Sequence, residues 1–251
     1  MDNQVAVIIL AAGLGTRMKS DKAKVLHEIL GKPMVLYVVE TARAVAGDDV
    51  ILVVGNQAEE VRRVVATNGQ SLFAFQDKQL GTGHAVLCAL PHIPDHCANV
   101  LILCGDVPLI TAETLCQLIQ DHEQNQRDIT VVAVEIDNPT GYGRILIDEN
   151  RQVYGIVEES DANGDQKKIR TINTGIYCVK KDFLKSALEK IRPDNSQGEF
   201  YLTDIIQIGY SEKKLAGVFM GQNEKEFQGV NTWQELQRVE ALMRTQLTNI
   251  A

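Results

Sequence analysis

Short apolar runs alternate with amphipathic stretches through the first half of the chain. The runs without polar alternation are predicted as strands: Val5–Leu10, Val50–Val54, Leu72–Phe75, Val100–Leu103 and Ile129–Val134. Stretches with helical spacing lie between them: Met34–Ala46, Ala58–Asn68, Ala85–Leu90 and Glu113–Asn125. Strands that are apolar on both faces are expected to be buried on both faces, as in a parallel sheet covered by helices. The pattern predicts an α/β fold with a doubly wound, mostly parallel Rossmann-like sheet.

The second half has shorter elements and more polar connections. Strands are predicted at Tyr142–Ile147, Gln152–Val157, Ile172–Val179 and Leu215–Met220, and helices at Asp182–Ile191, Tyr201–Ser211 and Thr232–Gln246. The polar stretch Asp161–Gln166 is predicted as an exposed loop. We interpret this half as a smaller subregion that closes one side of a cleft.

Composition narrows the kind of partner. The 251 residues carry 33 acidic and 25 basic side chains, and the formal charge of −8 opposes binding to long nucleic acids. The five cysteines form no Cys-x-x-Cys pair, so neither a disulfide framework nor a zinc site is expected. We expect a cytoplasmic protein, because the chain shows no signal peptide and no stretch of membrane-spanning length.

A small-residue loop with cationic side chains follows the first strand directly. Ala11-Ala12-Gly13-Leu14-Gly15-Thr16-Arg17-Met18-Lys19 lets the backbone approach phosphate oxygens, and Arg17, Lys22 and Lys24 add positive charge. Met18 takes the place of the third glycine of a dinucleotide fingerprint, and no Gly-Lys-Ser/Thr closes a P-loop. A generic phosphate site remains, and the alternative is a tight turn with exposed bases.

Two further segments suggest ligand contacts at the carboxyl ends of strands. Asp106 follows a buried strand and could hold Mg²⁺, or could simply cap the next turn. Gln76 offers both a donor and an acceptor to a pyrimidine edge, and the glycines beside Thr82 would admit a flat ligand. The alternative for Thr82 is a helix N-cap in an ordinary loop. His84 is interpreted as structural, because no nucleophile pattern accompanies it.

These segments together resemble the sugar-1-phosphate nucleotidyltransferases. Within that group the chain is most similar to the uridyltransferase domain of the bacterial bifunctional N-acetylglucosamine-1-phosphate uridyltransferase/glucosamine-1-phosphate acetyltransferases. The resemblance lies in segments that follow one another in unbroken order: Leu10 to Met18, Lys24-Val25-Leu26-His27, Gln79 to Ala85, Gly105-Asp106-Val107-Pro108-Leu109, Gly141 to Ile145, Ile172 to Ile176 and Gly198 to Asp204. It implies a fold of the nucleotide-diphospho-sugar transferase type. It also implies one nucleotidyltransferase domain over 1–251, with a nucleotide-binding half (1–135), a sugar-binding half (136–230) and a C-terminal helix (231–251).

The resemblance also implies roles for individual residues. Arg17 would act on the departing pyrophosphate and Lys24 on the reacting phosphates. The remaining nucleotide contacts would come from Leu10, Ala11, Ala12, Gly13, Gln76, Gly81 and Thr82, and the sugar contacts from Cys104, Gly105, Asp106, Gly143, Glu158, Asn173 and Asn231. Asp106 and Asn231 would bind Mg²⁺. The implied substrates are UTP and N-acetylglucosamine 1-phosphate.

Two departures from the family pattern limit what the resemblance implies. Cys104 stands where some members have tyrosine, and the hexapeptide-repeat acetyltransferase part is absent from the sequence. We therefore expect no acetyl-CoA binding and make no prediction of oligomeric state. Another pair of nucleotide and sugar phosphate, or a nucleotide-binding module without turnover, remain as alternatives. An NAD-linked oxidoreductase is disfavoured by Met18 and the cationic loop.

Overall fold

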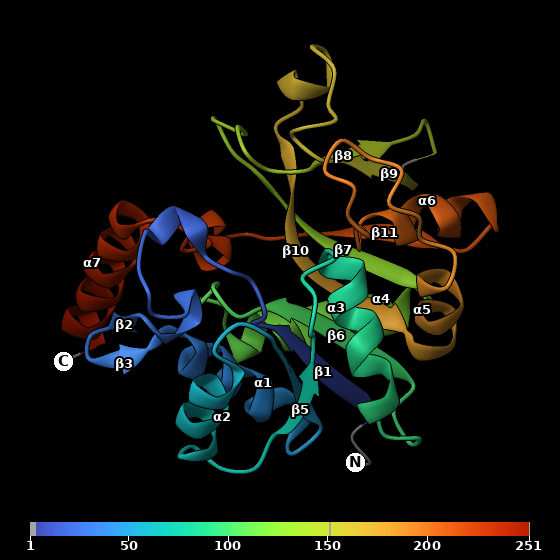
Figure 1. The fold of residues 1–251 in the computed structure, drawn as a ribbon. Helices are drawn as coiled ribbons and strands as arrows, with labels where there is room; N and C mark the ends of the chain where they lie inside the picture. The colour runs from blue at the N-terminus through green and yellow to red at the C-terminus, as the bar shows by residue number, and fades with distance from the viewer. Residues whose placement is uncertain (1–3, 151, 251) are drawn as a thin grey trace.

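A mixed sheet forms the centre of the computed structural model, which describes residues 4–150 and 152–250 (Figure 1). Residues 1–3 and 251, the ends of the expected domain, lie outside that part. Seven strands form the main path of the sheet: β1 (Val5–Leu10), β4 (Val50–Val54), β5 (Leu72–Phe75), β6 (Asn99–Cys104), β7 (Ile129–Glu135), β10 (Thr171–Lys180) and β11 (Ala216–Met220). Their order across the sheet is β11-β7-β10-β6-β1-β4-β5. Strand β1 pairs in parallel with β4 and β6, whereas β10 runs antiparallel to β6 and β7. The predicted mostly parallel α/β sheet is confirmed.

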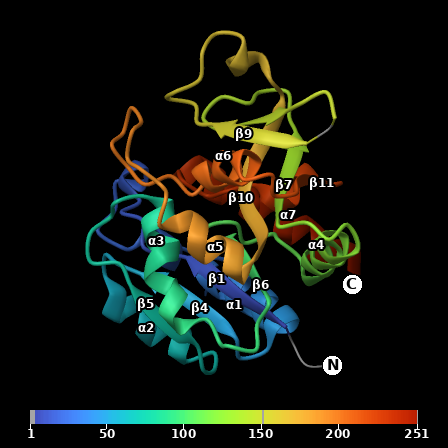
Figure 2. The same ribbon diagram turned by 90° about the vertical axis from the view of Figure 1, so that its right-hand side faces the viewer.

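Helices cover both faces of this sheet. Helices α1 (Met34–Ala46), α2 (Ala58–Ala66) and α4 (Ala112–Gln124) contribute to one core, and α3 (Thr82–Ala89), α5 (Lys181–Leu188) and α6 (Asp204–Ser211) to the other. Figure 2 shows α3 and α5 side by side. Alternate residues of β1 point to opposite cores, with Val7 in the first and Ile8 in the second. This alternation explains why the strand is apolar at every position.

The remaining elements extend the fold at two places. Strands β8 (Arg144–Ile147) and β9 (Val153–Val157) continue the sheet from β10 and stand above it in Figure 1. Helix α7 (Trp233–Ile250) packs against the short hairpin of β2 (Glu28–Ile29) and β3 (Lys32–Pro33). A third cluster of buried side chains fills that contact: Met18, Ile29, Met34, Leu109, Val230, Leu236, Val239 and Met243. In the described part of the chain, no helix has the length and apolar character that a membrane crossing requires.

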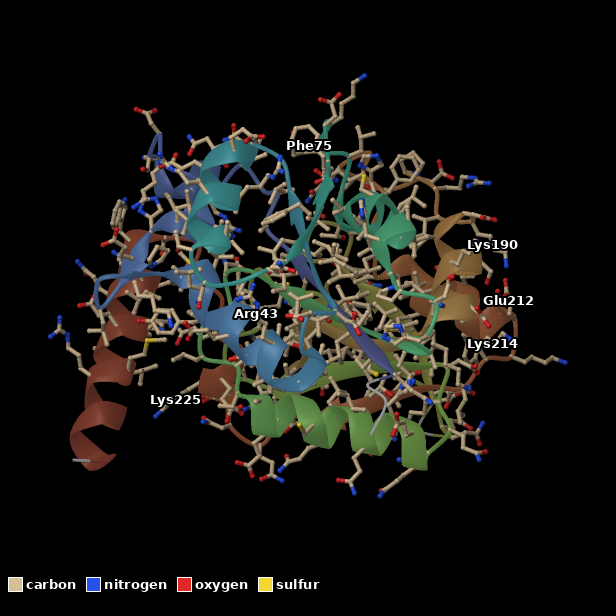
Figure 3. The ribbon with its side chains drawn as sticks, turned by 90° about the horizontal axis from the view of Figure 1, so that it is seen from below. Arg43, Phe75, Lys190, Glu212, Lys214 and Lys225 are labelled. Atoms are coloured by element: carbon tan, nitrogen blue, oxygen red, sulfur yellow. The ribbon has the colours of Figure 1, made fainter. Side chains whose placement is uncertain are left out.

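The structure corrects several expectations about single elements. Strand β5 lies at the sheet edge, so Leu72 and Phe75 are exposed rather than buried, and Phe75 projects from the strand in Figure 3. The third helix begins at Thr82 instead of Ala85, and the sixth begins at Asp204 instead of Tyr201. The β2–β3 hairpin was not predicted, because its turn places Leu30 and Gly31 at positive φ without the usual Asn-Gly signal.

Candidate active site

The loop after β1 is held at the carboxyl edge of the sheet by its backbone. The Ala11 amide donates to the Val53 carbonyl at 2.9 Å, and the Gly105 amide donates to the Leu10 carbonyl at 2.9 Å. Gly15 has a φ of 63°, and a Cβ there would lie 2.6 Å from Cβ of Lys24. Glycine at this position therefore lets the loop close against the segment that carries Lys24.

Met18 anchors the cationic loop. Its side chain is buried in the cluster beneath α7, and its carbonyl accepts a 2.9 Å hydrogen bond from Nε1 of Trp233. The Trp233 ring also meets the His27 ring edge to face, with centroids 4.8 Å apart. The residue that breaks the dinucleotide fingerprint thus serves to fix the loop against the last helix.

Four polar residues from distant parts of the sequence meet at the mouth of this loop. Lys24 Nζ lies 2.5 Å from Oδ2 of Asp106 and 2.9 Å from Oδ1 of Asn231. Arg17 Nη2 donates to the same Asn231 oxygen at 2.8 Å. A backbone hydrogen bond from the Val230 amide to the Asp106 carbonyl, at 2.9 Å, joins the loop after β6 to the segment before α7. Lys22 does not join this group, because it pairs with Glu28 at 3.4 Å.

The oxygens of Asp106 and Asn231 fit a divalent cation. Both oxygens accept hydrogen bonds from the Lys24 ammonium. The same two oxygens could instead coordinate a small cation at that position. A carboxylate and an amide carbonyl are hard ligands of the type that Mg²⁺ takes together with substrate phosphates and water. These residues could therefore hold Mg²⁺, and the two cationic side chains lie beside them, since Lys24 and Arg17 both contact Oδ1 of Asn231.

A cavity of about 450 Å³ opens beside this charged group. Its lining includes ten of the predicted residues: Leu10, Ala11, Ala12, Gly13, Lys24, Gln76, Gly81, Thr82, Cys104 and Asp106. Sequence reasoning assigned no role to other lining residues, namely Leu14, Gly15, Thr16, Val25, Gln79, Ala85 and Glu199. Gln79 and Glu199 lie within the family segments quoted above, which was the available signal for them. A cavity of this size suits a nucleotide-sized ligand.

The buried Gln76 amide is fixed by two partners. Nε2 donates to the Gly81 carbonyl at 3.1 Å and lies 3.0 Å from Nδ1 of His84. Both amide hydrogens are therefore used within the protein, and His84 must accept at Nδ1. This corrects the expectation that Gln76 offers a ligand both a donor and an acceptor, because its oxygen remains as the group for the ligand.

The glycines beside Thr82 have a structural role in addition to the ligand contact expected of them. A Cβ at Gly81, where φ is 112°, would lie 2.6 Å from the Phe200 carbonyl oxygen, and one at Gly83 would lie 3.0 Å from it. These glycines thus allow a close approach of the protein's own backbone, and Gly81 also lines the cavity. Thr82 is not the N-cap of α3 either, because its hydroxyl accepts a hydrogen bond from the Leu202 amide at 3.0 Å.

Gly143, Glu158 and Asn173 form a second group beyond the cavity lining. The Asn173 amide donates to the Gly143 carbonyl at 2.8 Å, and a Cβ at Gly143 would lie 3.2 Å from Oε2 of Glu158. The Asn173 side chain donates to the Tyr177 hydroxyl at 2.8 Å. Burial raises the pKa of Glu158, although its hydrogen bond from the Thr203 hydroxyl acts in the opposite direction.

Two links join this second group to the cavity. Cys104 Sγ donates to the Gly175 carbonyl at 3.6 Å, next to Asn173. Burial, together with the nearby Asp106 carboxylate, raises the pKa of Cys104 to about 12, so the thiol stays protonated. The second link is the segment 199–203, which contacts Thr82 through Leu202 and Glu158 through Thr203. Gly143, Glu158 and Asn173 therefore lie directly beyond the cavity, whereas the predicted sugar residues Cys104 and Asp106 line it.

Comparison with known proteins identifies relatives of this chain. The family model described as the MobA-like NTP transferase domain matches residues 7–170. The chain is 42% identical over 243 residues to the bifunctional protein GlmU of Desulfotalea psychrophila. This alignment covers 97% of this chain and 71% of that protein. It is 45% identical over 245 residues to GlmU of Syntrophotalea carbinolica, covering 98% of this chain and 52% of that protein. The chain therefore spans about half the length of several curated relatives that it matches.

Solved structures share the fold at low sequence identity. A Bacillus anthracis protein described as a glucose-1-phosphate thymidylyltransferase, in complex with a sucrose, aligns with a TM-score of 0.74 and 20% identity, covering 96% of this chain and 95% of its own. HddC from Yersinia pseudotuberculosis, complexed with GMP-PN, aligns with a TM-score of 0.68 and 22% identity, covering 95% and 99%. These likenesses establish the nucleotide-diphospho-sugar transferase fold for this chain.

Proposed function

Because the chain belongs to the family of MobA-like NTP transferase domains, we propose that it transfers UMP from UTP to N-acetylglucosamine 1-phosphate, releasing pyrophosphate. The observation that carries the proposal is the meeting of Lys24, Arg17, Asp106 and Asn231 beside a cavity with a fixed Gln76 amide. The choice of substrates follows from the family resemblance in the sequence and from relatives at 42% to 45% identity.

The proposed reaction needs no protein nucleophile. An oxygen of the sugar phosphate attacks the α-phosphorus of UTP, a new phosphorus–oxygen bond forms, and the bond to the departing pyrophosphate breaks. The work of the protein is to position the two anions and to offset their charge. Lys24 would contact the reacting phosphates, and the exposed Arg17 would contact the pyrophosphate. Mg²⁺ held by Asp106 and Asn231 would supply further charge neutralisation.

Sugar recognition is assigned to Gly143, Glu158 and Asn173. Glu158 and Asn173 carry oxygen and nitrogen atoms suited to hydroxyl groups, and a side chain at Gly143 would crowd Glu158, whose Oε2 lies 3.2 Å from the Cβ position. Within this proposal the nucleotide contacts come from residues before 135 and the sugar contacts from both sides of it, and the division of the chain into two halves stays a prediction.

A pyrophosphate-release assay tests the proposal. Turnover is expected with UTP, N-acetylglucosamine 1-phosphate and Mg²⁺, and we expect it to exceed turnover with dTTP, CTP or GTP, or with glucose 1-phosphate. Highest turnover with another pair would keep the reaction type and reject the substrates. Tight UTP binding without pyrophosphate release from any pair would favour a nucleotide-binding module instead.

Substitution of Asp106 tests the metal assignment. Asp106→Asn keeps the size of the side chain and removes its charge, so kcat should fall about 100-fold or more. The thermal midpoint should change little, because the residue is partly exposed. Asp137→Asn, at a highly exposed ion-paired aspartate, is the matched control and should keep full activity. An Asp106→Asn protein with normal kcat and normal Mg²⁺ dependence would reject the assignment.

Substitution of Glu158 tests the sugar assignment. Glu158→Gln should raise KM for the sugar phosphate about 10-fold or more and leave KM for UTP nearly unchanged, because the side chain lies beyond the nucleotide cavity. Glu149→Gln, at an exposed turn position, serves as the control. Equal increases in both KM values would remove Glu158 from the sugar site.

A further inference from the structure

Asp49, His96 and Cys97 lie together at the edge of the sheet opposite to the proposed active site. Asp49 directly precedes β4, and His96 and Cys97 precede β6, so the group lies at the amino ends of these parallel strands. His96 Nε2 lies 2.8 Å from Oδ2 of Asp49, and Cys97 Sγ lies 3.8 Å from the same oxygen. The three side-chain atoms are all within 4.8 Å of one another.

Backbone hydrogen bonds hold the two loops that carry these residues. The Asp49 carbonyl accepts from the Val7 amide at 2.9 Å, which continues the pairing of β1 with β4. The Cys97 amide donates to the Pro94 carbonyl at 3.2 Å, and the next amide, of Ala98, donates to the Gln4 carbonyl at 2.8 Å. The Asp49, His96 and Cys97 group thus crosses the start of β1, between its two neighbouring strands, and does not depend on a flexible segment.

We propose that Asp49, His96 and Cys97 bind a zinc ion. A thiolate, an imidazole and a carboxylate are the donors that Zn²⁺ takes in proteins, whereas the oxygen-only pair of Asp106 and Asn231 suits Mg²⁺. Zinc binding displaces the thiol proton to solvent and involves no oxidation or reduction. His96 and Cys97 also line a cavity of about 910 Å³, which leaves room for water as a fourth ligand.

The sequence alone gave no sign of this site. The expectation of no zinc site depended on the lack of a Cys-x-x-Cys pair, and the ligands here come instead from loops about 47 residues apart that the parallel sheet brings side by side. A metal ion in this place would connect the starts of β4 and β6 across β1. We therefore expect it to stabilise the fold rather than take part in nucleotidyl transfer.

Cobalt provides a direct spectroscopic probe of the site. The protein is titrated with Co²⁺ and then Zn²⁺ in the presence of excess Mg²⁺, which occupies oxygen-only sites. We expect one equivalent of Co²⁺ to give thiolate-to-metal charge-transfer absorption, and one equivalent of Zn²⁺ to abolish it. Zinc at about 100 times its dissociation constant should raise the thermal midpoint by about 5 °C or more.

Matched variants decide whether these three residues are the ligands. Cys97→Ser should remove the charge-transfer absorption, and His96→Asn and Asp49→Asn should weaken zinc binding about 10-fold or more. His92→Asn and Cys116→Ser change an exposed histidine and an exposed cysteine outside the group and should bind zinc normally. Absence of stoichiometric binding by the unaltered protein, or full absorption in Cys97→Ser, would overturn the proposal. Because the readout is binding rather than turnover, its failure would leave the proposed reaction untouched.

Discussion

At the scale of single residues, the proposed function gives the Gln76 amide the task of selecting one type of base edge. Both of its hydrogens are directed to the Gly81 carbonyl and to Nδ1 of His84, so only the amide oxygen is left for a ligand. An oxygen acceptor suits the N3–H of uracil, whereas cytosine presents an acceptor at that position. His84 acts here as a positioning residue, because it sets the orientation of the amide without itself lining the cavity.

Removing the His84 acceptor should therefore loosen nucleotide selection. His84→Ala should raise KM for UTP about 5- to 10-fold, the value of one lost orienting hydrogen bond, with a smaller effect on kcat. The ratio of kcat/KM for UTP to that for CTP should fall, as measured by pyrophosphate release. His84→Asn, whose amide oxygen can accept a hydrogen bond, should recover part of the ratio. An unchanged ratio in both variants would make His84 a packing residue only.

The glycine at position 81 allows the segment around Phe200 to pack closely against the turn before α3. Gly81→Ala would force a side chain to a φ of 112° and place its Cβ 2.6 Å from the Phe200 carbonyl. We expect a loss of about 2–4 kcal/mol of unfolding free energy, from backbone strain and from displacement of the Phe200 segment. Gly164→Ala is the control, because no atom lies within 4 Å of its Cβ position. Urea unfolding of both variants measures the difference, and equal stability would contradict this account of the segment.

At the scale of elements, the candidate active site is formed by helices, strands and loops that are far apart in the sequence. Helix α7 supports the first loop through Trp233 and Met18, and segment 199–203 supports the Thr82 turn. Strand β10 places Asn173 beside the end of β6, because it runs antiparallel to that strand. The carboxyl ends of β1 and β6 supply only part of the site, and segments from the second half complete it.

The elements were predictable wherever a local pattern fixed them. Helix α1 and strands β1, β4 and β5 have the bounds expected from the sequence, because the apolar residues are helically spaced in α1 and contiguous in the three strands. The exposure of Phe75 was not predictable, since an edge strand and a central strand share the same apolar pattern. The start of α3 at Thr82 was also missed, because Gly81-Thr82-Gly83 is typical of a loop.

The site was predictable in its residues more than in its contacts. The family resemblance implied roles for Asp106, Asn231 and Lys24, and the structure brings them within hydrogen-bonding distance. The Gln76 to His84 contact could have been suspected from its short spacing, but its hydrogen-bond directions depend on the turn between them. The cluster of Asp49, His96 and Cys97 could not be predicted, because strand order is what makes its members neighbours.

At the scale of the whole molecule, a buried histidine lies between helix α4 and strand β7. His122 of α4 is almost completely buried, and its Nδ1 lies 2.9 Å from the Thr130 hydroxyl of β7. Among the described residues, Nε2 of His122 has no hydrogen-bond partner. Burial, with smaller contributions from Lys180 and Arg127, lowers its pKa from 6.5 to about 4, against a weaker opposite effect of Asp128.

This shift makes stability depend on pH in a defined window. The unfolded chain protonates His122 near pH 6.5, whereas the folded protein holds it neutral down to about pH 4. Between these values the unfolded state binds more protons, so the free energy of unfolding falls as pH falls. The contribution is fully present above pH 6.5, and its loss approaches about 3 kcal/mol near pH 4.

Replacing the histidine should remove this part of the pH dependence. His122→Asn keeps a polar group beside Thr130 and cannot titrate, so its free energy of unfolding should decline less than that of the unaltered protein between pH 6.5 and 4. Denaturant titrations across that range measure the difference, and His92→Asn, at an exposed histidine, should follow the unaltered protein. The difference between the two curves should change by about 3 kcal/mol over that range, because acid protonates His122 in the unfolded chain of the unaltered protein and the variant has no such group. Parallel curves would mean that His122 is protonated equally in the folded and unfolded states.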